Sequence, residues 1–244
     1  MARSSRRLGA VRPRGEASAG GVKARLTRLA VRTGLVLLLG PALVLGLYRV
    51  LPPPITPLML VRLVEGEGLD RSWRSLDSIA PTLPRALIAA EDNQFCRHFG
   101  FDWAELRGQV ELALQGERTR GASTITMQVT RNALLWPGRD IVRKLVELWL
   151  TPQTELLWGK RRILEIYLNI VEMGPGIYGA EAAAQAYFGT SAAELSARQA
   201  ALIAAILPNP RIYSASEPSA YVRERATVIE RRVGQLGPLL DCAP

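Results

Sequence analysis

The chain has 244 residues, which leaves room for one sizeable domain with a hydrophobic core and excludes two catalytic domains. Its formal net charge of +9 is concentrated in residues 1–32, where nine basic residues are opposed by a single acidic one, Glu16. The remainder holds 22 basic and 21 acidic residues, so the charge does not indicate a nucleic-acid partner.

An apolar segment, residues 33–51, follows the basic tail. Its length is close to the roughly 20 residues that a bilayer-spanning helix needs, and Tyr48 and Arg49 near its end suit the membrane interface. The positive-inside rule places the tail in the cytoplasm and everything after Leu51 outside. The segment could instead belong to a cleaved signal peptide, but no small-x-small cleavage site precedes Pro52. A third alternative, a buried helix of a soluble protein, does not explain the neighbouring arginines. We therefore expect a signal-anchor.

The segment after the anchor begins with a proline-rich stretch, residues 52–57, which predicts a stiff extended exit. Residues 58–64 are expected either to touch the bilayer surface or to pair as a short strand. Helical patterning dominates the rest and predicts helices over residues 83–92, 103–115, 123–135, 141–150, 160–170, 180–187, 193–206 and 221–236. Thr82 and Ser191 are helix-start signals, and Pro152 is expected to interrupt a helix. The fold class is mainly α.

Five regions follow from this reading. They are a basic cytoplasmic tail (1–32), an anchor helix (33–51), a proline-rich exit and juxtamembrane segment (52–80), a catalytic domain (81–237) and a C-terminal tail (238–244). A disulfide between Cys96 and Cys242 is permitted outside the membrane, but the expected state is two unpaired thiols, with Cys96 a small buried hydrophobe. One histidine and two distant cysteines do not make a tetrahedral zinc site, so no dedicated protein metal site is expected.

The first motif that carries chemistry is Glu-Asp-Asn-Gln-Phe-Cys-Arg-His-Phe-Gly-Phe-Asp, over residues 91–102. An apolar run brings Glu91 to the end of a helix with Asp92 beside it, and both desolvation and a neighbouring like charge make a carboxylate more basic. Glu91 is therefore the candidate general base. Asp92, Phe95 and His98 are expected around the substrate, although a solvated acidic pair and a structural histidine would explain the same residues.

The second motif crowds hydroxyl and amide groups before a cation, over residues 121–132. Positions 124, 128 and 131 share one helix face, whereas 125 and 129 can point to the core. A solvated helix with an N-cap at Ser123 is the plain alternative, but the adjacent cation and amide suit sugar and phosphate recognition. The candidate binding residues here are Ser123, Thr124, Gln128, Arg131 and Asn132.

A third group consists of Arg143 and Lys144, which precede Glu147 by four and three residues. That spacing is explained by an ordinary salt-bridge cluster on a helix. Lys160 opens a fourth motif, residues 160–169, and a fifth covers residues 176–188. Glu165, Tyr167 and Asn169 look architectural.

These five motifs, in this order, resemble the glycosyltransferase domain of peptidoglycan polymerases, which join the membrane-bound precursor lipid II into glycan chains. The resemblance implies a lysozyme-like core with a small jaw that partly dips into the membrane, preceded by one transmembrane helix. The monofunctional branch is the better match, because the chain has neither the space nor the Ser-x-x-Lys motif of a transpeptidase domain. Three positions depart from the family pattern: Arg131 replaces a usual lysine, Gly159 replaces a usual serine, and Pro152 interrupts what is usually a continuous helix.

The resemblance also implies a reaction. Glu91 would deprotonate the sugar 4-hydroxyl of lipid II, and Glu147 would be the second carboxylate of the cleft. Cations would hold the departing diphosphate, with Mg²⁺ or Mn²⁺ bridging it and no organic cofactor; they are Arg131, Arg143, Lys144 and Lys160. The implied product is a β-1,4-linked strand formed with inversion as undecaprenyl diphosphate leaves. The implied setting is the bacterial inner membrane, with a periplasmic catalytic domain and a possible cell-wall synthesis complex.

Two other functions compete with this one. A lytic transglycosylase or muramidase would use a glutamate acid on the same fold to cleave glycan, but cleavage has no diphosphate for the cations to hold. A membrane-tethered scaffold would need no acid at position 91.

Overall fold

The computed structural model describes residues 19–117, 121–138 and 140–244. It divides into two compact units, Met1–Ala42 and Leu43–Pro244. Residues 1–18 of the predicted cytoplasmic tail lie outside the described residues. The first helix, α1 (Ala19–Val50), contains the segment Lys23–Val50, which has a mean hydropathy of 1.9. Within the described ranges it is the one helix that is long and apolar enough to cross a membrane, as expected for the anchor.

Residues 57–64 form a helix, α2 (Pro57–Val64), so the alternative of a short strand was wrong. Thr56 is its N-cap, since the Oγ1 atom accepts a hydrogen bond of 3.3 Å from the backbone N–H of Met59. Pro57 occupies the first turn, where its missing N–H has no partner to lose. The threonine–proline pair was thus a helix-start signal. Leu60 and Val64 are exposed on this helix, whereas Met59 is buried.

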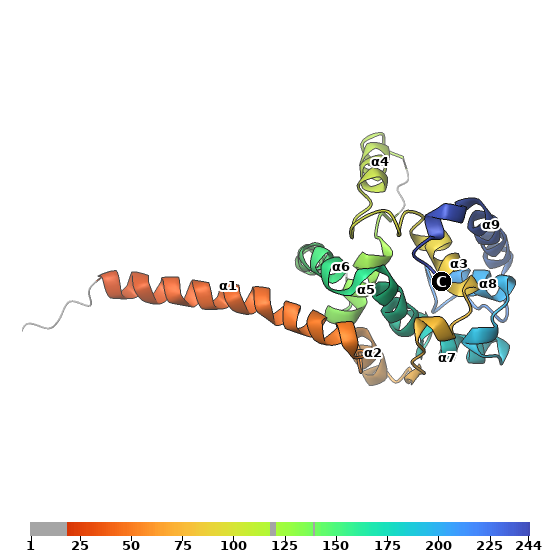
Figure 1. Cartoon of the computed structure of the whole chain (residues 1–244), viewed down its shortest axis with the longest axis horizontal. Coiled ribbons are helices and arrows are strands. Elements are labelled where there is room, and N and C mark those ends of the chain that lie inside the picture. The colour runs from red at the N-terminus through yellow and green to blue at the C-terminus, as the bar shows by residue number, and fades with distance from the viewer. Residues whose placement is uncertain (1–18, 118–120, 139) are drawn as a thin grey trace, which may run out of the picture. The chain divides into compact units, whose positions relative to one another are not determined.

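The second unit is mainly α, as predicted (Figure 1). Its longer helices are α3 (Thr82–Glu91), α4 (Trp103–Leu114), α5 (Ile125–Leu134), α6 (Ile141–Ile170), α7 (Gly179–Phe188), α8 (Ala197–Ile206) and α9 (Ala220–Leu236). Helix α5 packs on α6, while α8 packs between α3 and α9. The start signal at Ser191 belongs to a short 3-10 turn, Ala192–Glu194. The α-helix itself begins five residues later, at a capping box formed by Ser196 and Gln199.

A three-stranded sheet, which the sequence pattern did not predict, lies beside these helices. Its order is β1-β3-β2, from β1 (Asp70–Arg71), β2 (Glu172–Gly174) and β3 (Ile177–Tyr178). Strand β1 is parallel to β3 and β2 is antiparallel to it. Gly176, before β3, has φ +69°, and a Cβ there would lie 2.1 Å from the carbonyl oxygen of Glu67. Only glycine permits this approach of the juxtamembrane chain.

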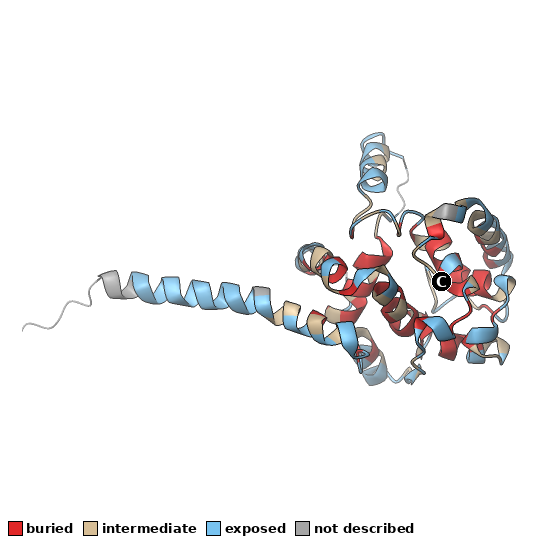
Figure 2. Cartoon of the chain, viewed as in Figure 1, coloured by how far each residue is buried: buried red, intermediate tan, exposed pale blue. Residues whose placement is uncertain are grey.

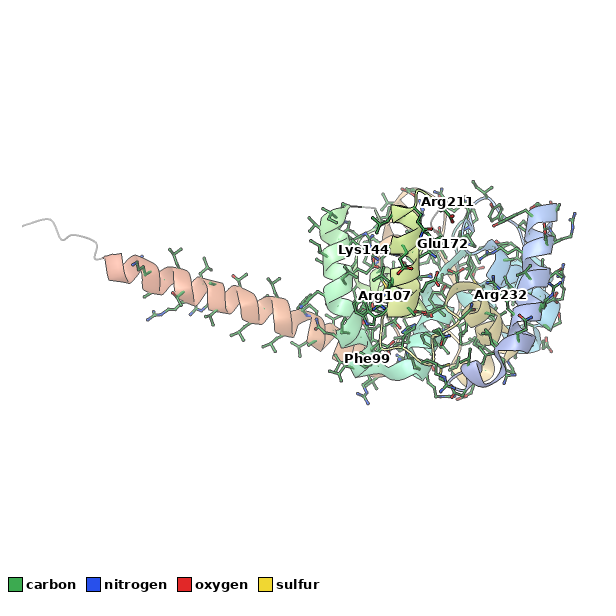
Figure 3. All side chains as sticks on the ribbon, turned by 90° about the horizontal axis from the view of Figure 1, so that it is seen from above. Phe99, Arg107, Lys144, Glu172, Arg211 and Arg232 are labelled. Atoms are coloured by element: carbon green, nitrogen blue, oxygen red, sulfur yellow. A yellow bond between two sulfur atoms is a disulfide. The ribbon has the colours of Figure 1, made fainter. Side chains whose placement is uncertain are left out.

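An ion-pair cluster joins α2 to the sheet. The Nε atom of Arg62 lies 3.3 Å from Glu172, and Arg211 pairs with Glu67 from the loop after α8. Burial raises the pKa of Glu172, and Arg62 partly opposes that rise. Glu172 and Arg211 are labelled close to one another in Figure 3.

Element α6 consists of two helices that meet at a kink, which confirms the prediction of two helices here but moves the break from Pro152 to Gly159. It runs from Ile141 to Ile170, and Pro152 lies inside it without ending it. Around the proline, Thr151 donates to the Glu147 carbonyl at 2.7 Å and Thr154 to the Leu150 carbonyl at 3.1 Å, so side chains supply extra hydrogen bonds to the ladder. The kink occurs instead at Gly159, whose φ of 69° is left-handed.

The core lies between α3, α5, the second half of α6, α7 and α8, which Figure 2 shows as the red part of the second unit. Ile125 and Val129 are fully buried, which confirms that this face of α5 points to the core. Helix α4 has no buried residue and projects from the rest of that unit. Its position is therefore not set by core packing.

The expectation of two unpaired thiols was wrong, because Cys96 and Cys242 form a disulfide. Sequence separation had suggested two unrelated positions, 146 residues apart. The fold brings them together because the C-terminal segment returns to the loop after α3. Arg85 Nε on α3 donates to the carbonyl of Pro244 at 3.0 Å, and Arg97 in the loop pairs with Asp241 at 3.0 Å.

Replacing both cysteines by serine should lower the free energy of unfolding by about 2–4 kcal/mol, because the disulfide closes a long loop in the unfolded chain. Denaturant unfolding of the detergent-solubilised chain measures this change. Each single replacement should cost about as much as the double one, and a reductant should destabilise only the unaltered chain. Equal stability of the unaltered and doubly replaced chains would contradict the prediction.

Candidate active site

Glu91 lies at the edge of a cavity of about 830 Å³ between the end of α3, α5 and α9. Its side chain is 17% exposed, so substrate and solvent can reach it. The Nε2 atom of Gln128 donates to one carboxylate oxygen at 3.0 Å, and Arg225 on α9 lies 3.6 Å from the other. The carboxylate is thus held in place by one amide and one cation while still facing the cavity.

A hydrogen bond from Tyr167 orients the side-chain amide of Gln128. The hydroxyl of Tyr167, which is fully buried on α6, donates to the Oε1 atom of Gln128 at 3.1 Å. Burial raises the pKa of this hydroxyl well above its usual value, and the negative charge of Glu91 adds to the rise. Tyr167 therefore remains a donor across the physiological pH range, so the NH₂ group of Gln128 is turned to Glu91.

Asp92 points away from Glu91 and joins the first two motifs. Its carboxylate accepts from the backbone N–H of Ile125 at 2.9 Å, at the start of α5, and from His98 Nε2 at 2.9 Å. A negative charge at a helix N-terminus is favourable. Asp92 and His98 thus support the site by joining its segments, and neither of the two bonds involves Glu91.

A buried polar network, which the sequence reading had missed, surrounds Glu155 and joins α6 to Gly100 and α5. The Oε1 atom of Glu155 accepts from Gly100 N at 3.0 Å, from Thr126 Oγ1 at 2.7 Å and from Lys160 Nζ at 2.5 Å. The ammonium group of Lys160 lies 4.4 Å from the centre of the Phe95 ring. Burial lowers the pKa of Lys160, and Glu155 opposes this. These contacts tie Lys160 and Phe95 to the network.

The second motif divides into cavity and support positions. Ser123, Gln128 and Arg131 line the large cavity. Thr124, rather than Ser123, is the N-cap of α5: it accepts from Met127 N and donates to the Gly100 carbonyl at 2.6 Å. Asn132 accepts from Arg131 Nε at 3.3 Å.

Arg143, Lys144 and Glu147 form the expected cluster on α6. Glu147 is 1% exposed, and its two carboxylate oxygens lie 2.5 Å from Arg143 and from Lys144. Arg143 lines a second cavity, of about 310 Å³, together with Arg131 and Asn132. Arg131 therefore lines both cavities and connects the region of Glu91 with that of Arg143.

Helix α9 contributes residues that the sequence reading did not propose. Tyr221, Glu224, Arg225 and Arg232 all line the large cavity. Figure 3 shows Arg232 on α9 and Lys144 on α6, on opposite sides of the second unit. Arg232 also lines a third cavity, of about 310 Å³, with Glu91, Asp92 and Asp102. The available signal was the spacing of seven residues between Arg225 and Arg232, which places two cations on one helix face.

The acidic groups of the site do not form a metal cage. In the described parts of the chain, no three His, Cys, Asp or Glu side chains are grouped so that they could hold an ion. Asp92 and Glu147 are each taken up by protein donors.

Replacing Glu155 by alanine should destabilise the domain by about 3–5 kcal/mol, because it leaves the ammonium of Lys160 buried without its partner. Denaturant unfolding measures the loss. Lys160→Met alone should also destabilise, whereas the double replacement should cost less than the two single losses added together. Additive losses would show that the pair is not coupled.

Comparisons with known proteins show the family of the chain. The transglycosylase family profile matches residues 59–233. The chain is 50% identical to a biosynthetic peptidoglycan transglycosylase of Caulobacter vibrioides over 223 residues, which cover 91% of this chain and 97% of that protein. Proteins of the same name from Rhizobium meliloti and Rhodospirillum centenum are 51% and 52% identical over 85% and 84% of this chain, and over 89% and 88% of their own lengths.

Proposed function

Because the chain belongs to the transglycosylase family of peptidoglycan synthesis, we propose that it polymerises lipid II with Glu91 as general base. The chain is a peptidoglycan glycosyltransferase of cell-wall synthesis. The proposal concerns how its residues perform the reaction. The observation that carries it is a partly exposed carboxylate and a cation, Arg131, lining one cavity.

In the proposed step, the 4-hydroxyl oxygen of lipid II attacks the anomeric carbon of the lipid-linked strand. The new C–O bond forms as the bond to the diphosphate breaks, and the diphosphate leaves with that electron pair. The hydroxyl proton passes to Glu91. Attack opposite the leaving group inverts the α-linked donor to a β-1,4 bond. Gln128 and Arg225 hold the carboxylate during this transfer, because both already contact it.

The departing diphosphate is proposed to lie near Arg131 and Arg143, in the second cavity. Fixed cations stabilise negative charge that develops as the bond breaks. The same cavity is bordered by Leu58 of α2, Leu135 and Trp136, so its wall is partly apolar and suits the lipid end of a donor. Lys144 adds a further positive charge beside Arg143 through their shared partner, Glu147.

We propose that a divalent ion, Mg²⁺ or Mn²⁺, is bound by the oxygens of the substrate diphosphate. It would offset the phosphate charge there. No dedicated protein site is proposed for it, and no organic cofactor.

The proposed setting is the bacterial inner membrane, crossed once by α1, with the basic tail in the cytoplasm and the catalytic domain in the periplasm. The hydropathy of α1 and the nine basic residues before its apolar part support this orientation. The disulfide gives independent support, because such bonds persist in oxidising compartments. Lipid II, the nascent strand and a cell-wall synthesis complex are the proposed partners.

Glycan cleavage is the alternative that shares this geometry, since a glutamate acid also serves lytic enzymes. The arginines argue against it, because a sugar leaving group carries no diphosphate. Incubation of the purified chain with labelled lipid II separates the two activities. Synthesis yields a polymer that a muramidase digests, whereas cleavage shortens preformed strands.

Glu91→Gln should lower the rate of lipid II polymerisation by about 10²–10⁴-fold, because the amide cannot accept the hydroxyl proton. The matched control is Glu224→Gln, which changes another carboxylate on the wall of the same cavity. This control should polymerise within about twofold of the unaltered chain, the size expected where no proton transfer is lost. Full activity of Glu91→Gln would refute the assignment of Glu91 as the general base.

Arg131→Ala should lower polymerisation by about 10²-fold or more, because it removes a fixed cation from the leaving-group side. Arg131→Lys should retain more activity than the alanine variant, since it keeps the charge but loses the planar fork. Initial rates at saturating lipid II measure both. Equal losses in the two variants would show that the geometry of the guanidinium, rather than its charge, is required.

A further inference from the structure

The end of α1 and the chain that leaves it are held by two arginines from distant parts of the sequence. Arg162 on α6 donates to the carbonyl of Tyr48 at 2.8 Å and to that of Leu51 at 2.8 Å. Arg71 in β1 donates to the carbonyls of Pro53 at 2.6 Å and Pro54 at 3.0 Å. Four carbonyl groups within seven residues of the exit therefore accept from guanidinium groups of the domain.

Trp73 joins the two arginines. The guanidinium carbons of Arg71 and Arg162 each lie 5.5 Å from the centre of its ring, a distance at which a cation is attracted to an aromatic face. Arg162 is also paired with Glu165, which accepts from the backbone N–H of Leu76 at 3.3 Å. We refer to Arg71, Trp73 and Arg162 as the exit clamp.

The exit clamp suits its position chemically. The last carbonyls of a helix lack intrahelical donors and carry partial negative charge, so cations there satisfy both needs. In the described part of the chain, Arg71 has no ion pair with a carboxylate, and burial lowers its pKa. Its partners are instead carbonyl oxygens, the ring and the sulfur of Met59 at 3.8 Å.

The same stretch of α6 reaches the catalytic network. Trp158 Nε1 donates to the Leu45 carbonyl at 2.7 Å, on the last turns of α1. Two residues further along, across the kink at Gly159, Lys160 bonds Glu155 in the buried polar network. The contacts that hold the chain exit and those that support the catalytic cleft are therefore adjacent along one helix.

We propose that the exit clamp is a positioning device, which fixes the point where the chain leaves the bilayer against the catalytic domain and so sets the height of the cleft above the membrane. This inference rests on the proposed function, because the substrate is taken to be a lipid whose diphosphate lies at the headgroup level. A loose exit would leave chemistry intact but would let the cleft move away from that level, and small misplacements of reacting groups are costly.

The test compares each of two variants in two environments, a lipid bilayer and detergent micelles. Arg162→Ala and, separately, Arg71→Ala are reconstituted in liposomes containing lipid II and are also assayed in detergent micelles, which adapt to the protein and impose no plane. Each variant should polymerise about tenfold or more slowly in liposomes and within about twofold of the unaltered chain in micelles, where chemistry alone decides the rate. The matched control is Arg161→Ala, which removes a neighbouring cation whose ion pair is with Asp77, at 2.7 Å.

If a variant loses the same fraction of its activity in liposomes and in micelles, the substitution causes general damage and the proposal is overturned. The proposal is also overturned if the variants are as active as the unaltered chain in both. A second measurement does not depend on turnover. Spin labels at two exposed positions, introduced as Val50→Cys and Ala193→Cys, should give a narrow distance distribution that broadens in Arg162→Ala and not in Arg161→Ala. An unchanged width of the distance distribution in Arg162→Ala would overturn the clamp, whether or not lipid II is the substrate. If the distribution broadens as expected but the unaltered chain does not polymerise lipid II, the result counts against the proposed function alone.

Discussion

The arrangement of the catalytic site depends on the carboxylate of Asp92. It joins the end of α3 to the first backbone N–H of α5 and holds His98 at the same time. Asp92 is 7% exposed and bonded to protein donors, whereas the carboxylate of the adjacent residue, Glu91, lines the large cavity. Two neighbouring acids in the sequence therefore have different tasks, one structural and one chemical. The pairing of α3 with α5 also places Gln128 where it can hold Glu91.

Helices could be predicted well from the sequence because they are long and periodic, and their apolar positions, such as Ile125 and Val129, are buried as expected. What could not be predicted depends on contacts between distant residues. The strands have two or three residues, too few for an alternating pattern. The disulfide joins residues 146 positions apart, and no local feature announces it. Pro152 was overestimated as a helix breaker, since the helix continues past it to the kink at Gly159.

The same distinction applies to the site. The sequence motifs identified Glu91 and Arg131, which line one cavity in the structure, because each belongs to a short segment that concentrates polar and charged side chains. They did not separate residues that face the cavity from residues that hold them, and Lys160 is the main example. Its charge suggested a phosphate ligand, whereas its ammonium group is bonded to the buried acid Glu155, five residues earlier along α6. The cations of α9, including Arg225, were missed because an arginine-rich surface helix is common in water.

Helix α4 shows what remains when core packing does not constrain a segment. It has no buried residue, and Trp103, Val110 and Leu114 on it are exposed. Substitutions there leave the core intact, so natural variation along α4 is not filtered by folding. Where related proteins do keep particular side chains on α4, selection must act through what the helix touches outside its own chain. An aligned set of relatives would therefore separate functional from structural constraint more cleanly on this helix than on α5 or α6.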